Sequence, residues 1–363
     1  MRGVSAVGVS ASGTMLSSAR MPIADVRSDV PLAPLTTLGI GGPAKRFARV
    51  TSASEVADAL AEADAAGERV LILGGGSNLV VRDQGWPGLV LQIAIDDVRV
   101  DNDGDDFAIV HAAAGVVWDE LVEELVAQGL AGVECLSGIP GLVGATPMQN
   151  VGAYGQEVAD TIVRVHAFDR EALEPVAFAP AACEFAYRTS AFKGKERYAI
   201  TEVEFRLPRR IDSLPIKYAE LAKALAVPEG ATASLASVRN TVIALRRKKG
   251  MVVDPADPDS RSAGSFFTNP IVSLEIAATL PADAPKWPQP DGRVKLSAGW
   301  LIERAGFAKG MQRGTVGISS KHALALVNLG GATTHALLAL AHEIVDGVRA
   351  KLGVELVPEP VIV

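Results

Sequence analysis

Residues 136–155 read LSGIPGLVGATPMQNVGAYG, and this stretch decides the expected fold. The twenty positions from Ser137 to Gln156 carry no charged side chain and include five glycines. So many glycines exclude a stable helix, and a loop this long inside a compact domain is usually either functional or disordered. Its apolar content argues against disorder. We therefore interpret it as a functional loop, in which Gln149, Asn150 and Tyr154 supply neutral polar groups.

A second glycine-rich segment precedes this loop. The apolar residues 69–73 predict a buried strand that leads directly into Gly74-Gly-Gly-Ser-Asn78. The turn matches neither G-x-G-x-x-G nor the lysine-containing P-loop, so by itself it is equally consistent with an ordinary tight turn. Combined with the uncharged loop, it indicates two backbone-lined loops around a long neutral ring system with a pyrophosphate at one end. This describes a flavin dinucleotide better than a free nucleotide.

The remaining sequence mixes predicted helices and strands, which indicates an α+β fold with mixed sheets. The acidic residues 96–106 contain Asp-Asn-Asp-Gly at 101–104, which predicts a solvated hairpin turn rather than a calcium loop. Residues 208–212 indicate a domain boundary. Helices are expected at residues 54–66, 116–127, 237–249, 297–305 and 333–352, and strands at residues 89–95, 107–113, 161–168, 198–207 and 323–328, with a final strand near Val354.

Length and composition exclude several classes of protein. The 363 residues suffice for two domains, and 35 Lys and Arg against 42 Asp and Glu give a net charge of −7, which argues against nucleic acid as a partner. No apolar run approaches the roughly 18 to 20 residues that cross a bilayer, so no membrane partner is expected. Residues 1–28 lack the apolar centre of a signal peptide, and we expect a flexible leader there.

The cysteine and histidine positions indicate neither disulfides nor a metal. Cys135 and Cys183, the only two cysteines, form no Cys-x-x-Cys pair and fit free thiols in a reducing cytoplasm. No metal site is expected, because the histidines show no metal-binding spacing along the chain. They are His111, His166, His322, His335 and His342.

Five motifs occur in the order that is typical of one enzyme family. They are residues 71–79, 136–155, Tyr-Arg-Thr-Ser at 187–190, Gly-Ser-Phe-Phe-Thr-Asn-Pro at 264–270 and Pro-Glu-Pro at 358–360. This set, which spans the chain from about residue 30 to its end, resembles the UDP-N-acetylenolpyruvoylglucosamine reductase family. The resemblance implies a two-subdomain FAD-binding domain of the vanillyl-alcohol-oxidase (PCMH) type over residues 29–210. A smaller α+β substrate-binding domain is implied over residues 211–363.

The resemblance also implies the reaction and its partners. The expected cofactor is FAD, the reductant NADPH, and the substrate UDP-N-acetylglucosamine enolpyruvate, which is reduced to UDP-N-acetylmuramate for peptidoglycan synthesis in the cytoplasm. No His or Cys lies within residues 137–156, so we expect non-covalent FAD. The sequence leaves the oligomeric state undetermined, and we favour a monomer.

Carried over by motif, the implied catalytic residues are Arg188, Ser265 and Glu359. Arginine suits the substrate carboxylate and the enolate that develops after hydride transfer, a protonated or hydrogen-bonded Glu359 would assist the same charge, and Ser265 would deliver the proton. The implied flavin contacts come from the two glycine-rich segments: Gly74, Gly75, Gly76, Ser77, Asn78, Ser137, Gly138, Ile139, Pro140, Gly141, Gly144, Thr146, Gln149, Asn150, Gly152, Ala153, Tyr154 and Gly155.

The implied substrate contacts are Tyr218, Lys249, Asn269 and Trp287. Tyr218 is nearly as consistent with a core tyrosine, and Lys249 with a basic residue that complements a helix C-terminus. Trp287 stands where some members of the family offer a tyrosine to the diphosphate. Around Glu359, the family's acidic residue before Pro-Glu and its arginine after it are both missing.

Two other functions compete with the reductase. A flavin oxidase acting on an alcohol would use the same class of flavin domain, but it would not need the motif at residues 264–270. A non-catalytic nucleotide-binding module would bind without chemistry. Visible absorption of the purified protein distinguishes that module from either flavoenzyme.

Overall fold

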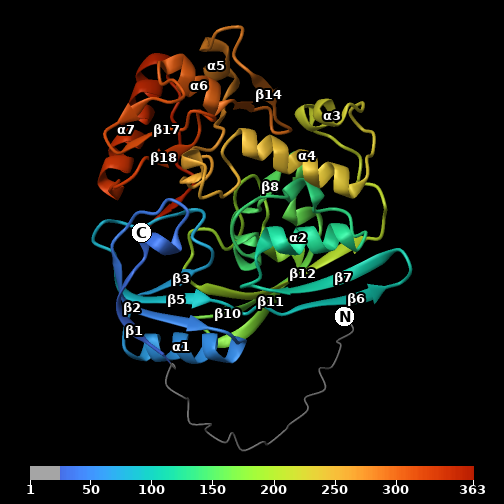
Figure 1. The fold of residues 1–363 in the computed structure, drawn as a ribbon, viewed down its shortest axis with the longest axis vertical. Helices are drawn as coiled ribbons and strands as arrows, with labels where there is room; N and C mark the ends of the chain where they lie inside the picture. Colours follow the sequence, from blue (N-terminus) through green and yellow to red (C-terminus); the bar gives the residue numbers. More distant parts are fainter. Residues whose placement is uncertain (1–24) are drawn as a thin grey trace, which may run out of the picture.

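The computed structural model describes residues 25–363. Residues 25–210, called the first part of the chain, contain a four-stranded and a five-stranded sheet (Figure 1), and residues 211–363 are called the second part. One sheet has the strand order β1-β2-β5-β3 and the other β11-β10-β12-β7-β6. The strands of this part are β1 (Arg27–Pro31), β2 (Pro43–Val50), β3 (Val70–Leu73), β4 (Leu79–Val80), β5 (Trp86–Ile93), β6 (Val98–Asp103), β7 (Phe107–Ala113), β8 (Gly152–Ala153), β9 (Gln156–Glu157), β10 (Ile162–Asp169), β11 (Glu174–Phe178) and β12 (Tyr198–Pro208).

The predicted leader over residues 1–28 extends too far along the chain. Its first 24 residues lie outside the described part of the chain. Arg27 and Ser28, however, belong to β1 and pair with Phe47 and Arg46 of β2. The sheet therefore begins inside the segment that was expected to be a leader.

Helices α1 (Ala53–Ala65) and α2 (Trp118–Ala127) lie on opposite sides of the sheets in Figure 1. The Ser52 hydroxyl accepts a hydrogen bond from the Glu55 N–H and so caps α1. Helix α1 buries residues at helical spacing, among them Val56 and Leu60, and α2 buries Trp118 on its inner face. Both helices share one apolar core with the sheet, which holds the loop after α2 in a fixed position.

The acidic segment forms a strand instead of a long turn. Residues 98–103 are β6, which pairs antiparallel with β7, and the turn begins only at Gly104, where φ is +71°. Val98 and Val100 pack against the core. Their alternation with polar residues gives the period-2 pattern of a half-buried strand, which outweighs the acidic side chains.

A second apolar core surrounds α7 (Thr334–Leu352) and consists mostly of residues of the second part of the chain, together with Leu38, Ile40 and Val80. Five predicted helices are confirmed to within two residues at each end. They are those over residues 54–66, 116–127, 237–249, 297–305 and 333–352.

None of the helices within residues 25–363 is long and apolar enough to cross a membrane. The second part contains α3 (Ala219–Leu225), α4 (Leu235–Lys248), β13 (Ile271–Val272), α5 (Leu274–Thr279), β14 (Lys286–Pro288), β15 (Val294–Leu296), α6 (Ala298–Ala305), β16 (Gln312–Arg313), β17 (Val316–Ile318), β18 (Leu326–Asn328) and α7 (Thr334–Leu352).

The end of the chain returns to the first part. The strand expected near Val354 is absent, and Val354 is instead a buried core residue outside any strand. The last strand is β19 (Val361–Ile362), which pairs in parallel with β4 through Val361 and Leu79. The predicted boundary between residues 210 and 211 stays a prediction, but this pairing places the Pro-Glu-Pro motif between the two parts of the chain.

Candidate active site

A cavity of about 1050 Å³ lies where the two glycine-rich segments face the second part of the chain. Its volume is at the upper end of the range for small-molecule sites, which suits an elongated dinucleotide. All three expected catalytic residues line it. So do most of the expected flavin contacts, namely Gly74, Gly75, Gly76, Ser77, Asn78, Ile139, Pro140, Gly141, Gly144, Thr146, Gln149, Gly152, Ala153 and Tyr154.

The two glycine-rich segments touch backbone to backbone. A Cβ on Gly75 would lie 2.8 Å from the Cα of Gly141, which leaves no room for a side chain. The Ser77 hydroxyl donates a hydrogen bond of 3.0 Å to the carbonyl of Pro140. Their close contact creates an uncharged wall of backbone groups and short side chains. Such a wall fits the isoalloxazine ring and pyrophosphate of FAD.

Four expected flavin contacts do not line the cavity: Ser137, Gly138, Asn150 and Gly155. The N–H of Gly138 donates to the Asp119 carboxylate at 2.5 Å. Asn150 adopts the left-handed conformation with φ of 47°, and its amide donates to Glu157 at 2.7 Å. These bonds give the uncharged loop its shape, because they satisfy polar groups that the loop would otherwise bury without partners.

Arg188 is fixed across the hairpin of β8 and β9. Its backbone has a φ of 54°, and its Nη2 donates to the carbonyl of Gly152 at 2.7 Å. Its Nε lies 3.5 Å from Oε1 of Glu359. The guanidinium therefore joins the uncharged loop to the end of the chain, and its position in the cavity wall is set by both.

Ser265 and Glu359 are brought together by backbone pairing. The N–H of Glu359 donates to the carbonyl of Phe266 at 2.9 Å, and Phe267 forms a bridge with Pro358. Phe266 and Phe267 are fully buried and anchor the motif that carries Ser265. Both functional side chains consequently line the same cavity.

The Glu359 carboxyl is held in a largely desolvated position, with its side chain 13% exposed. Burial raises the pKa of Glu359, although Arg188 opposes the shift by favouring the charged form. Gln149 donates to Oε1 at 3.2 Å, and Asn78 in turn donates to the Gln149 amide oxygen at 3.1 Å. The two glycine-rich segments and the Glu359 carboxyl thus share one hydrogen-bond chain.

Three further residues of the cavity wall were not expected from motifs. The Lys193 ammonium donates to the carbonyl of Arg188 at 2.8 Å, and burial lowers its pKa. Arg246 donates to the carbonyl of Gly138 at 3.1 Å, and burial lowers its pKa to about 10. Burial also lowers the pKa of His322 to about 4, so its imidazole is neutral near pH 7. Arg246 stands in the basic run at 246–249, whereas Lys193 and His322 carry no local signal.

Tyr218 and Lys249, two of the expected substrate contacts, line the cavity. The Tyr218 ring is 44% exposed and meets the Tyr154 ring edge-on, with centroids 5.5 Å apart. Lys249 is the C-cap residue that follows α4, and its Nζ lies 2.7 Å from the Glu220 carboxylate. Tyr218 is therefore not a core tyrosine, and Lys249 combines a helix-end position with access to the cavity.

Asn269 and Trp287 lie outside this cavity. Asn269 lines an adjoining cavity of about 810 Å³, which Arg188 and Lys193 also line. Its side-chain oxygen accepts a hydrogen bond of 2.9 Å from the N–H of Ala298 at the start of α6. Trp287 is on β14, with 46% of its surface exposed.

Comparisons with known proteins agree with this arrangement. The family model described as an FAD binding domain matches residues 44–172, and the model for the C-terminal domain of UDP-N-acetylenolpyruvoylglucosamine reductase matches residues 255–363. Proteins named UDP-N-acetylenolpyruvoylglucosamine reductase from Thermobifida fusca and Streptomyces avermitilis are 53% and 52% identical to this chain. Each alignment covers 92% of this chain, and 97% and 94% of the relatives respectively.

A solved structure shares the fold over nearly the whole length. The crystal structure of the reductase of the same name from Thermus caldophilus aligns with a TM-score of 0.65 at 28% identity, covering 93% of this chain and 99% of that one. The predicted α+β fold, with an FAD-binding domain of the vanillyl-alcohol-oxidase type before the C-terminal domain, is confirmed. So are the flavin cofactor and the assignment to the oxidoreductases. The chain belongs to the UDP-N-acetylenolpyruvoylglucosamine reductase family.

Proposed function

We propose that this chain reduces UDP-N-acetylglucosamine enolpyruvate to UDP-N-acetylmuramate with NADPH, in the cytoplasm, as a step of peptidoglycan precursor synthesis. A hydride adds to the vinyl carbon distal to the carboxylate, a proton adds to the carbon beside it, and NADPH becomes NADP⁺. The observation that carries this proposal is the convergence of Arg188, Ser265 and Glu359 on one cavity with the two glycine-rich segments.

The residues of the cavity wall suit a non-covalently bound FAD. Its ring and pyrophosphate would lie against the turn at Gly74–Asn78 and the uncharged loop, where backbone groups and neutral side chains offer hydrogen bonds. The chemistry that FAD supplies when bound is hydride transfer from NADPH to the vinyl carbon of the substrate. This chain's own residues bind the substrate, stabilise the charge that develops on it, and supply the proton.

Arg188 stabilises the negative charge on the pyruvyl group. Its guanidinium is held by the carbonyl of Gly152 and faces Glu359, so it needs little reorganisation when the enolate develops. A fixed cation in a partly desolvated cavity favours an oxyanion far more than the same cation would in water. The Lys193 ammonium lies on the same wall, donates to the carbonyl of Arg188 and adds a second positive charge.

Glu359 assists the developing enolate, and Ser265 provides the proton. Because burial raises the pKa of Glu359, the carboxyl keeps its proton to a higher pH than an exposed glutamate and can donate a hydrogen bond to the developing enolate. Ser265 delivers its hydroxyl proton to the carbon beside the carboxylate. An alcohol is a weak acid, so Ser265 is reprotonated through a neighbouring donor or a water.

Substrate contacts away from the reacting carbons come from Tyr218, Lys249, Asn269 and Trp287. Lys249 lies on the wall beside Tyr218, where an ammonium suits a substrate or NADPH phosphate. Asn269 lies in the adjoining cavity, next to Arg188. Trp287, exposed on β14, can stack on the nucleotide and donate one indole N–H to the diphosphate.

Anaerobic rapid mixing tests the proposed function. NADPH should bleach the visible absorption of the yellow protein, and UDP-N-acetylglucosamine enolpyruvate should then restore it with one equivalent of UDP-N-acetylmuramate formed. Recovery with an alcohol-derived carbonyl compound but not with this substrate would favour the oxidase alternative. A colourless protein that FAD cannot reconstitute would exclude both flavoenzyme functions.

A further inference from the structure

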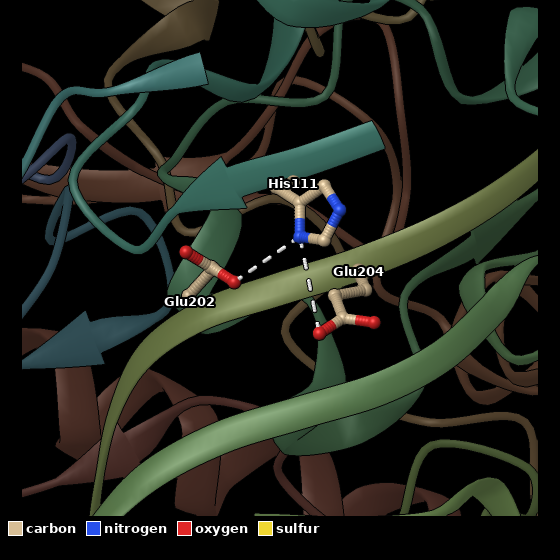
Figure 2. A group of neighbouring side chains, drawn as sticks. All are labelled: His111, Glu202 and Glu204. Carbon is tan, nitrogen blue, oxygen red and sulfur yellow. Dashed lines mark ion pairs between the residues drawn. The ribbon is translucent and has the colours of Figure 1, made fainter. Parts of the chain in front are cut away.

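Four side chains converge on one face of the five-stranded sheet, away from the active site. They are His111 of β7, His166 of β10, and Glu202 and Glu204 of β12. The donor atoms of His111, Glu202 and Glu204 all lie within 4.8 Å of one another, and Figure 2 shows these three side chains pointing toward one another. His166 joins the group through Glu204, whose Oε1 lies 2.6 Å from its Nε2. We propose that these four side chains form a binding site for a divalent transition-metal ion of the zinc type. This site is independent of the flavin chemistry.

Strand register produces the convergence. β12 lies between β10 and β7, and pairs Glu202 with His166 and Glu204 with His111. Glu202 and Glu204 are two residues apart, so their side chains project from the same face of the strand. The alternate residues Val203 and Phe205 are buried in the core, where the Phe205 ring lies 5.9 Å from Trp118 of α2. The four polar side chains therefore occupy the face opposite α2.

The distances from each histidine nitrogen to the two glutamate oxygens can be compared with those between ligands of one small ion. His111 Nδ1 lies 3.5 Å from Glu202 Oε1 and 3.8 Å from Glu204 Oε1. His166 Nε2 lies 3.7 Å from Glu202 Oε1 and 2.6 Å from Glu204 Oε1. Ligands about 2.0–2.2 Å from a tetrahedral zinc ion are about 3.3–3.6 Å apart. Three of these four distances are close to that value, and the His166–Glu204 distance must increase when an ion binds.

A second carboxylate orients His111. Asp101 Oδ2 of β6 lies 3.3 Å from Nε2, the ring nitrogen that faces away from the glutamates. Histidine ligands of metals commonly donate this other N–H to a carboxylate, which leaves the first nitrogen free to bind the ion. Arg99 pairs with Asp101 at 2.9 Å and so holds it in place. The cluster therefore contains an oriented ligand as well as a set of donors.

Charge and burial also favour a cation at this position. The side chains of His111 and Glu204 are 16% and 14% exposed, so the charge on Glu204 is poorly solvated. Glu202 adds a second carboxylate, and Arg164 has its Nε 3.9 Å from Glu204 Oε2. A divalent ion would compensate both carboxylates. Two imidazole nitrogens in the donor set favour zinc-type ions over calcium and magnesium, which prefer oxygen ligands alone.

The expected effect of the ion is on stability. None of the four residues lines the flavin cavity. An ion bound to them would join β7, β12 and β10, and through Asp101 also β6. Binding to the native state alone raises the unfolding temperature with ion concentration, without any change in turnover.

Calorimetric titration of the tag-free, chelator-treated holoenzyme with Zn²⁺ tests the proposal. The parent should bind one Zn²⁺ per chain and unfold at a higher temperature with it. Glu204→Gln, which keeps the side-chain size, and His166→Ala should each weaken Zn²⁺ binding at least a hundredfold. Asp101→Asn should weaken it about ten- to hundredfold by releasing His111. The control variant His342→Ala, which changes an exposed residue of α7, should bind Zn²⁺ as tightly as the parent.

All four variants should keep the flavin absorbance and NADPH-dependent flavin reduction of the parent, which shows that they fold. The proposal is overturned if the parent binds no stoichiometric Zn²⁺. It is equally overturned if Glu204→Gln or His166→Ala binds Zn²⁺ as tightly as the parent and His342→Ala do, because the ion would then lie elsewhere.

Discussion

The Nε of Arg188 lies 3.5 Å from Oε1 of Glu359, although one residue comes from the first part of the chain and the other from its extreme end. Gln149 of the uncharged loop donates to the same carboxylate oxygen at 3.2 Å. The carboxyl that we assign to the substrate half-reaction is thus in contact with the uncharged loop and with the arginine to which we assign stabilisation of the enolate. Its protonation state depends on both neighbours.

The pH dependence of substrate reduction should report on Glu359. Because burial raises its pKa, the protonated form persists above the usual pKa of a glutamate and is lost as pH rises through the raised value. The rate of flavin reoxidation should fall over that interval. Glu359→Gln should slow reoxidation and remove this descending limb. Stopped-flow reoxidation at a series of pH values provides the measurement, and an identical limb in the variant would assign it to another group.

Ser265→Ala should separate the two half-reactions. Flavin reduction by NADPH requires no proton at the enol carbon, so bleaching should proceed at close to the parent rate. Reoxidation by the enolpyruvyl substrate should slow roughly a hundred- to ten-thousand-fold, the usual cost of losing a placed general acid. Ser265→Cys should retain more activity because a thiol is the stronger acid. Equal slowing of both half-reactions would show that Ser265 acts on the fold or the flavin instead.

Lys249→Ala tests the assignment of this lysine to a phosphate. Loss of a charge-assisted hydrogen bond should raise the KM for the substrate or for NADPH roughly ten- to hundredfold and leave bound flavin unchanged. Lys248→Ala is the matched control, because Lys248 is exposed in the same last turn of α4 but does not line the cavity. Steady-state kinetics with each ligand distinguish a phosphate contact from a purely structural role at the helix end. Unaltered KM values for both ligands would indicate that Lys249 only complements the C-terminal end of α4 and pairs with Glu220.

Gly75→Ala should reduce flavin binding. The added methyl would lie 2.8 Å from the Cα of Gly141, and backbone cannot move aside as a flexible side chain can. Such overpacking typically costs about 1–3 kcal/mol. At the adjacent Gly74 the nearest atoms would be 3.9 Å away, so Gly74→Ala should be tolerated. The ratio of visible flavin absorbance to protein absorbance measures the flavin content of both variants, and thermal unfolding measures their stability. Equal flavin content in both would contradict the proposed contact between the segments.

Local sequence patterns predicted the five longest helices within residues 25–363, but not the short helices α3 and α5. The apolar spacing of α7 predicts its buried face, because residues three and four apart lie on one side of a helix. The glycines and absence of charge in the uncharged loop indicate a close backbone approach, and the structure brings Gly75 and Gly141 together. The expected strand near Val354 was wrong because apolar residues that fill a core need not belong to a sheet.

Only the tertiary structure brought distant residues together. Arg188 and Glu359 meet because β19 pairs with β4, and His111 meets Glu204 because β7 pairs with β12 in one particular register. The spacing of these residues along the sequence shows neither relationship. Lys193 and His322 reach the cavity wall in the same way, without any local motif. Helical and turn patterns come from interactions a few residues apart, whereas strand partners and their register depend on the packing of the whole chain, because a shift of one residue would turn every side chain to the opposite face.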